Sequence, residues 1–205
     1  MKARSVPELR IVVLAAGFSA RLGQPKALAR IHGRTLLQRT LWVLAPFAGA
    51  SQVIVVIPAA AGRYKIGSCA HAAAFLSNPR RASGLSSSVR LGLRRARAAA
   101  GVLLLPVDLA GLARRDIARL IARWRGARRR VAARRVRDAP GVPLILPRWL
   151  YARTRELTGD HGLREVVRRL PPGEVVLLAL PSANWDVDTP RDLERARRRI
   201  RPREP

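Results

Sequence analysis

The sequence of 205 residues contains one cysteine, few aromatic residues and no long apolar run. The single cysteine, Cys69, excludes an internal disulfide and a cysteine-rich zinc site. No apolar stretch approaches the roughly 20 residues that are needed to cross a bilayer. The apolar patch at 11–16 follows a polar start and is too short for the core of a secretory signal. We therefore expect a soluble cytoplasmic protein with no membrane partner.

Lysine and acidic residues are scarce beside arginine. The 40 Lys and Arg residues oppose 13 Asp and Glu, which gives a formal net charge of +27, yet only Lys2, Lys26 and Lys65 are lysines. A lysine inside a motif is therefore more informative than an arginine. The charge attracts polyanions non-specifically at low salt. Because the scattered tryptophans form no stacking platform, we expect no specific nucleic-acid partner, and we interpret the arginine-rich stretch 123–137 as a solvated face.

Acidic residues are absent between Glu8 and Asp108. A site that needs a carboxylate must therefore take it from Asp108 or from a later residue. The first half of the chain carries an almost purely positive field, which suits an anionic ligand such as a nucleotide.

Apolar runs alternate with amphipathic segments along the chain. Short β-branched runs predict buried strands, and apolar residues at helical spacing predict helices between them. This alternation favours an α/β fold with a mainly parallel sheet covered on both faces. No linker divides the chain, so we expect one domain over 10–200 with tails at 1–9 and 201–205. The expected strands cover 10–16, 52–57, 73–77, 101–107, 131–136 and 174–180, and the expected helices cover 35–44, 84–100 and 114–125, a segment after Pro147, a segment ending at Leu170 and a segment after Pro190.

The loop after the first strand is the leading candidate for a ligand site, because parallel sheets bind ligands beyond the carboxyl ends of their strands. From Leu14 to Lys26 it reads Leu-Ala-Ala-Gly-Phe-Ser-Ala-Arg-Leu-Gly-Gln-Pro-Lys. Small residues let the backbone approach a ligand, and loop amides can cradle phosphates. Arg21 offers two parallel hydrogen bonds to a phosphate, and Lys26 offers a mobile point charge. The spacing matches neither a Walker loop nor a G-x-G-x-x-G turn, and a plain strand-to-helix turn with solvated cations is the alternative.

This loop resembles the signature of the nucleotidyltransferases with a MobA-like fold. Its Ala-Ala-Gly is most similar to the molybdenum cofactor cytidylyltransferase branch of that family. The resemblance extends over nearly the whole chain, because further motifs follow in the order and spacing of the family. They are the loop from Asn78 to Ser88 with its Gly-x-x-x-Ser, Leu105-Pro-Val-Asp108, the turn-like Gly141-Val-Pro143, the turn Gly159-Asp160-His161-Gly162, and Asp186-Val-Asp188-Thr189-Pro190.

The resemblance implies a three-layer Rossmann-like nucleotidyltransferase fold. It also implies Mg²⁺-dependent transfer of a nucleoside monophosphate from a triphosphate to a phosphorylated acceptor, with release of pyrophosphate. For the cytidylyltransferase branch the donor is CTP and the acceptor is a molybdopterin-type cofactor, with a molybdoenzyme or an accessory protein as a further partner.

The same resemblance assigns roles to individual residues. It implies catalytic roles for Arg21, Lys26 and Asp108, and Mg²⁺ binding by Asp108 together with Asp188 or, less favoured, Asp186. Nucleotide contacts are implied for Leu14, Ala15, Ala16, Gly17, Arg21, Lys26, Asn78, Gly84 and Ser88, and substrate contacts for Gly141, Pro143, Asp160 and His161.

Several residues also have simpler interpretations. In the family the metal aspartate is usually followed, one residue on, by proline, whereas this chain has Asp108-Leu-Ala110. A degenerate homologue that acts as a binding or accessory module, and a sibling enzyme that uses GTP or a sugar phosphate, therefore stay open. The serines before Val89 also suit the start of a helix. Thr189 and Pro190 suit the cap and first position of the last helix.

Overall fold

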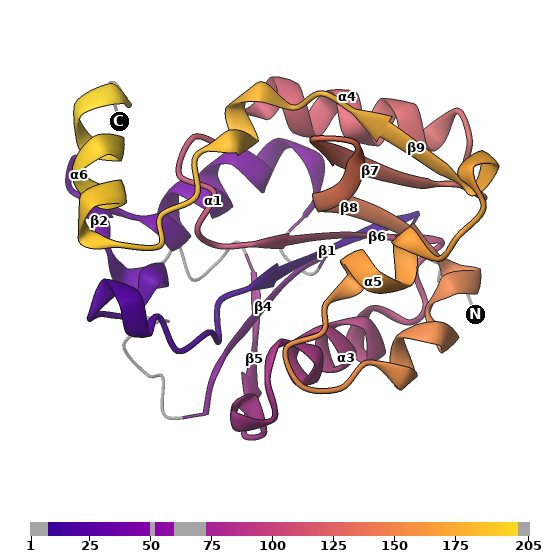
Figure 1. Ribbon diagram of the computed structural model, residues 1–205, viewed down its shortest axis with the longest axis horizontal. Helices are drawn as coiled ribbons and strands as arrows, with labels where there is room; N and C mark the ends of the chain where they lie inside the picture. The colour runs from indigo at the N-terminus through magenta and orange to yellow at the C-terminus, as the bar shows by residue number, and fades with distance from the viewer. Residues whose placement is uncertain (1–7, 50–51, 60–72, 201–205) are drawn as a thin grey trace.

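Seven strands form one sheet in the computed structural model, which describes residues 8–49, 52–59 and 73–200 (Figure 1). Their order is β5-β4-β1-β6-β8-β7-β9, and β8 runs antiparallel to both of its neighbours. Cys69, residues 1–7 of the expected N-terminal tail and the expected tail at 201–205 lie outside the described residues. The strands are β1 (Leu9–Leu14), β4 (Val53–Pro58), β5 (Ala74–Asn78), β6 (Gly101–Pro106), β7 (Val131–Val136), β8 (Ala139–Pro147) and β9 (Val175–Leu178).

The central position of β1 follows from its sequence, because a strand with apolar residues on both faces is stable only when both faces are covered. Ile11, Val12 and Val13 are fully buried. β1 pairs in parallel with β4 on one side and with β6 on the other. Leu14 pairs with Pro106, so the loop after β1 and Asp108 leave the sheet at the same edge.

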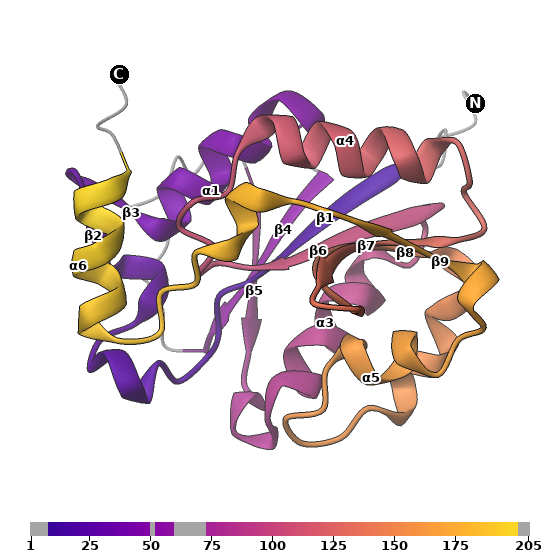
Figure 2. The ribbon, with the colours of Figure 1, turned by 45° about the horizontal axis from the view of Figure 1, so that its top comes forward.

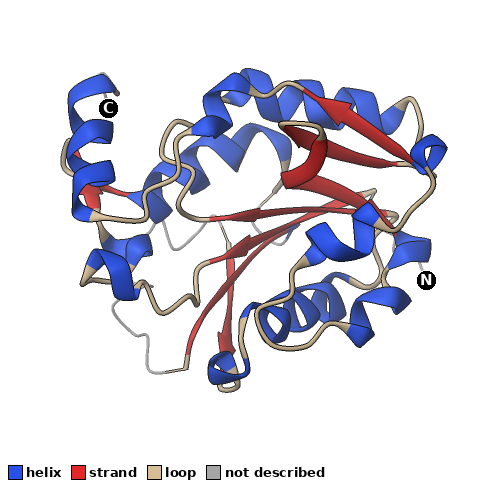
Figure 3. Ribbon diagram, in the orientation of Figure 1, coloured by secondary structure: helices blue, strands red, loops and turns tan. Residues whose placement is uncertain are grey.

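Helices cover both faces of the sheet (Figures 2 and 3). Ile11 and Val13 belong to the core on the side of α1, α4 and α6, and Val12 belongs to the core on the side of α3 and α5. The helices are α1 (Leu36–Leu44), α3 (Leu85–Ala96), α4 (Arg114–Arg125), α5 (Leu163–Arg168) and α6 (Pro190–Arg199). This three-layer arrangement around a mainly parallel sheet confirms the predicted fold class.

The last helix begins as its sequence predicts. The Thr189 hydroxyl caps α6 by accepting a hydrogen bond from the Asp192 amide, and the Asp192 carboxylate accepts one from the Thr189 amide. Pro190 is the first helical residue. Such a reciprocal cap fixes the angle at which the chain enters a helix. It therefore fixes the segment that carries Asp186 and Asp188.

Three segments differ from the expectation. β8 was not expected, because Pro140, Gly141 and Pro143 are residues that weaken a strand assignment. The chain after Pro147 forms short 3-10 turns instead of an α-helix. The helix expected to reach residue 100 ends at Ala96. Within the described ranges, no helix has the length and apolar character required to span a membrane.

Candidate active site

A cavity of about 440 Å³ opens at the carboxyl ends of β1 and β6. The loop after β1, the start of α3 and the segment after β6 form its walls, and Asp160 and Asp188 complete them. Figure 1 shows the indigo loop after β1 and the yellow segment before α6 on the same side of the molecule. Of the predicted nucleotide contacts, those that line this cavity are Leu14, Ala15, Ala16, Gly17, Arg21, Lys26, Gly84 and Ser88.

The loop from Leu14 to Lys26 is closed by one of its own side chains. Ser19 has a left-handed backbone (φ 57°), and its hydroxyl accepts a hydrogen bond of 3.0 Å from the Lys26 amide. Gly23 also has a positive φ of 71°, a conformation that favours glycine. The two turns bring both cations of the loop, Arg21 and Lys26, to the wall of the cavity.

Lys26 lies between two carboxylates from distant parts of the chain. Its Nζ is 2.7 Å from Oδ2 of Asp108 and also contacts Oδ1 of Asp188. The other oxygen of Asp188 lies 3.1 Å from Nη2 of Arg21. The Lys26 side chain is 18% exposed, whereas that of Arg21 is 72% exposed. Lys26 is thus the inner cation of the site and Arg21 the outer one.

Lys26 keeps its positive charge because two carboxylates lie beside it. Burial disfavours the ammonium, but Asp108 and Asp188 outweigh burial, and the pKa of Lys26 is raised. Lys26 therefore donates hydrogen bonds as an ammonium at neutral pH, and its position shows that the two carboxylates together accommodate one cation.

The same pair of carboxylates suits a divalent cation that arrives with a nucleotide. No group of three or more His, Cys, Asp or Glu residues in the described part of the chain could hold a metal by itself. Mg²⁺ commonly uses one or two carboxylates together with phosphate oxygens and water. Asp108 and Asp188 fit that requirement.

The turn after Asp108 is held without the proline that is usual in the family. The Ala110 amide donates to the carbonyl oxygens of Asp108 and Trp185, each at 2.9 Å, and the Val187 amide donates to the Asp108 carbonyl at 3.0 Å. A proline at residue 110 has no N–H for these bonds. Ala110, in place of the usual proline, therefore connects the Asp108 turn by a hydrogen bond to the segment that carries Asp188.

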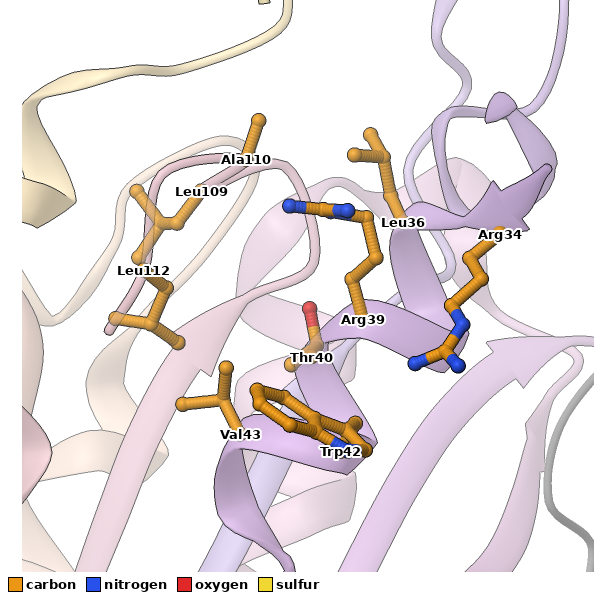
Figure 4. A pocket seen from close by; sticks show the side chains of 9 residues that line it. All are labelled: Arg34, Leu36, Arg39, Thr40, Trp42, Val43, Leu109, Ala110 and Leu112. Carbon is orange, nitrogen blue, oxygen red and sulfur yellow. The ribbon is translucent and has the colours of Figure 1, made fainter. Parts of the chain in front are cut away.

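Packing against α1 supports this turn from behind (Figure 4). Leu109 and Ala110 are buried, and with Thr40 and Val43 of α1 they line a pocket of only about 10 Å³. Arg39 extends from α1 into the same pocket (Figure 4). This pocket is too small for a nucleotide, and residues of the turn and of α1 line it together.

Asp186 and Asp188 face different partners. Oδ1 of Asp186 lies 3.9 Å from Nη1 of Arg134, outside the cluster at Lys26. Burial, together with repulsion from Asp108, raises the pKa of Asp186. The two carboxylates that meet at one cation are therefore Asp108 and Asp188.

The interpretation of 123–137 as a solvated face is wrong for β7, because Arg134 within that stretch is almost fully buried. It donates to the Val142 carbonyl at 3.2 Å and to Oδ1 of Asn184 at 2.8 Å. Gly141 and Pro143 flank Val142 within β8, not in a turn as their resemblance indicated. Gly141 and Pro143 do not line the cavity, and Arg134 connects Val142, which lies between them, with Asp186.

The turn at 159–162 packs on the start of α3. Asp160 accepts a hydrogen bond of 3.3 Å from the Leu85 amide, and the Gly159 carbonyl accepts one of 3.1 Å from the Ser86 amide. Asp160 lines the cavity. His161 does not, because its ring pairs with Glu165 at 2.5 Å on the surface.

Asn78 supports the cavity from behind its wall. Its side-chain amide donates to the hydroxyls of Ser87 and Ser88, both at 2.9 Å, and it is 2% exposed. Of these residues, Ser88 lines the cavity and Asn78 does not.

Several lining residues escaped the sequence reasoning, Phe18 and Arg81 among them. Phe18 is 59% exposed, and the guanidinium of Arg81 lies 4.6 Å from the centre of its ring. Both line the cavity. The exposed phenylalanine inside a glycine-containing loop was the available signal, whereas Arg81 is one arginine among many.

A parallel sheet with a cation-bearing loop and paired carboxylates at its carboxyl edge defines a nucleotide-binding α/β protein. Residues 11–175 match the MobA-like NTP transferase domain. The chain therefore belongs to this family and is a nucleotidyltransferase.

Solved structures share the fold over nearly the whole chain. Rv0371c from Mycobacterium tuberculosis H37Rv is 26% identical, with a TM-score of 0.76 over 95% of this chain and 100% of that one. A structure of the same protein in complex with manganese is 28% identical, with a TM-score of 0.72 over 94% of this chain and 100% of that one. Molybdopterin-guanine dinucleotide biosynthesis protein A from Archaeoglobus fulgidus has the same fold at 17% identity, with a TM-score of 0.72 over 92% and 97% of the two chains.

Proposed function

We propose that this protein transfers a nucleoside monophosphate, CMP in preference, from its triphosphate to a phosphate of a molybdopterin-type acceptor in the cytoplasm, with Mg²⁺ as cofactor. The convergence of Lys26, Asp108 and Asp188 at the wall of the cavity carries the proposal. The preference for CTP and for this acceptor rests on the Ala-Ala-Gly at 15–17. The manganese complex of Rv0371c supports a divalent cation.

The reaction needs placed charge more than acid–base groups. An oxygen of the acceptor phosphate forms a bond to the α-phosphorus, the bond from that phosphorus to the bridging oxygen breaks, and its electron pair leaves with pyrophosphate. Lys26 and Arg21 face the negative charge that grows on the leaving group. Charge stabilisation of this kind supplies a large share of the rate in many enzymes.

The two cations have different tasks because they differ in exposure. Lys26 is held in place by Asp108 and Asp188, so it is already oriented when the nucleotide arrives. Arg21 is largely exposed and can follow the triphosphate with little loss of hydration. Asp108 and Asp188 would hold the divalent ion, which would supply further positive charge to the triphosphate, while Lys26 would bind phosphate oxygens.

Calorimetry with CTP, GTP, ATP and UTP tests the proposal, each with and without Mg²⁺ or Mn²⁺. Moderately high salt suppresses the loose binding that a strongly basic protein shows toward any triphosphate. We expect cation-dependent preference for CTP, and pyrophosphate release only when the acceptor is present. A cation-dependent preference for another base would overturn the choice of CTP. Equal, salt-sensitive binding of all four would contradict the proposal.

Two substitutions test the mechanism. Lys26→Ala and Asp108→Ala should each lower turnover by about 100-fold or more. Each variant should stay folded, which a cooperative melting transition would show. Arg119→Gln, at an exposed position of α4, is the matched control for loss of charge. Wild-type turnover in either site variant would remove that residue from the mechanism.

A further inference from the structure

A second cavity, of about 570 Å³, lies against α3. It shares no lining residue with the first cavity, which contains Lys26 and Asp108 and is called the nucleotide cavity below. The end of β5, one side of α3 and the 3-10 turn at Ala152–Glu156 enclose it. That turn belongs to the orange segment before α5, which lies beside α3 in Figures 1 and 2. The volume falls in the range of small-molecule sites.

The lining of this cavity is basic and contains no acidic residue. Arg80, Arg90, Arg94 and Arg155 line it. Arg90 is anchored through a hydrogen bond to the Leu157 carbonyl. Within residues 8–49, 52–59 and 73–200, no ion pair or side-chain hydrogen bond engages the other three guanidiniums.

Four like charges gather around one hollow, with Arg80, Arg94 and Arg155 exposed and Arg90 partly buried. A guanidinium cannot relieve repulsion from its neighbours by losing its proton. An anion bound among them would replace this repulsion with paired, charge-assisted hydrogen bonds. A phosphate group matches the planar fork of arginine better than a simple halide does.

The remainder of the lining suits the organic part of a ligand. Leu91, Leu93 and Pro79 contribute apolar surface. Tyr151 turns its hydroxyl toward the Ala99 carbonyl at 3.4 Å, and burial raises its pKa against the opposing charge of Arg148. The phenol thus adds no negative charge to the cavity.

One side chain joins the two cavities. Asn78 and Ser87 line the second cavity, and Ser88 lines the nucleotide cavity. The Asn78 amide donates to both hydroxyls. A ligand in one cavity that displaces Asn78 would therefore shift a serine hydroxyl in the lining of the other cavity.

We propose that the second cavity is an effector site for a small phosphorylated molecule, and that its occupancy alters nucleotide affinity through Asn78. This site goes beyond the transfer reaction, because it shares no lining residue with the cavity that contains Lys26 and Asp108.

Inorganic tripolyphosphate is a suitable probe, because its binding can be measured by calorimetry without nucleotide or catalysis. At about 0.15 M salt, where surface charge is partly screened, we expect two binding events in the wild type. The Arg94→Gln/Arg155→Gln variant should lose one event and keep the other. Arg119→Gln/Arg123→Gln, with two exposed arginines of α4, should keep both. A single event in the wild type, or two in the Arg94/Arg155 variant, would overturn the site.

The effector role has its own test. Tripolyphosphate also competes with nucleotide at the first cavity, but that competition is the same in the wild type and in the Arg94→Gln/Arg155→Gln variant. The difference between their apparent nucleotide affinities therefore isolates the second cavity. We expect a difference of at least about threefold, a modest coupling. Equal affinities at every tripolyphosphate concentration would overturn the effector role, whatever the outcome for the transfer reaction.

Discussion

A Cβ atom added to Gly84 would lie 2.3 Å from the carbonyl carbon and oxygen of Gly159. Gly84 also has a φ of +86°, which other residues rarely adopt. The start of α3 and the turn that carries Asp160 can thus meet only because residue 84 has no side chain. This contact joins two walls of the nucleotide cavity.

Gly84→Ala should therefore destabilise the fold by about 1–3 kcal/mol and weaken nucleotide binding. Chemical unfolding and calorimetry measure the two effects. Gly173→Ala is the matched control, because that position has no neighbouring atom within 4 Å and no positive φ. Equal stability of the two variants would contradict the close approach.

Ala110→Pro tests the turn after Asp108. The substitution removes the amide that donates to the Asp108 and Trp185 carbonyls. We expect a loss of about 1–3 kcal/mol in the free energy of unfolding, because the carbonyl of the partly buried Trp185 loses this hydrogen-bond donor. We also expect reduced turnover, because the connection between Asp108 and the segment of Asp188 is loosened. Full stability and turnover in this variant would show that the turn needs no such hydrogen bond.

Arg134→Ala should affect both the fold and the reaction. The variant leaves the Val142 carbonyl and the Asn184 side chain without their buried donor, at a cost of about 2–3 kcal/mol. Turnover should also fall, because the segment that carries Asp188 loses its contacts with β7 through Asn184 and Asp186. Arg135→Ala removes the exposed neighbour on the same strand and should change neither quantity. Indistinguishable unfolding of the two variants would remove the structural role of Arg134.

The cap of α6 should make stability depend on acid pH. Hydrogen bonds from the Thr189 hydroxyl and amide lower the pKa of Asp192 below its ordinary value of 3.8. Because the folded pKa is the lower one, the contribution of Asp192 is complete above about pH 4 and is lost as the pH falls through the folded pKa.

Asp192→Ala should therefore be less stable than the wild type at pH 7, and the gap should narrow below pH 4. Urea unfolding at a series of pH values measures the gap. Thr189→Ala should lower the free energy of unfolding by about 1 kcal/mol at neutral pH. Glu194→Ala, at an exposed position of the same helix, is the control. A gap of constant size down to strongly acid pH would contradict the role of the carboxylate.

Much of the fold could be predicted because its strands are nearly continuous apolar runs. Ile11 to Val13 and Val102 to Leu105 need cover on both faces, and that requirement alone places them at the centre of a parallel sheet. β8 could not be predicted in this way. Its prolines contradict strand propensity, and only its partners β6 and β7 fix it in the sheet.

The candidate site, like the fold, contains some residues that the sequence could predict and others that it could not. Lys26 and Asp108 follow from motif and strand order, because the loop that leads to Lys26 follows β1 and Asp108 comes just after β6. The sequence alone could not show that Arg134 is buried, because arginine is the default cation of this chain. The bonds of Asn78 to two serines of α3 depend on how β5 and that helix pack, which local sequence does not encode.

The separation of charges along the chain has a consequence for synthesis. Lys26 pairs with Asp188, 162 positions later, and every carboxylate of the candidate site lies in the second half of the chain. A nascent chain thus exposes its cationic loop long before the residues that neutralise it. The completed cluster is among the last features to form, so a chain interrupted before residue 188 would retain the cationic loop but lack Asp188, one of the two carboxylates that we propose hold the metal.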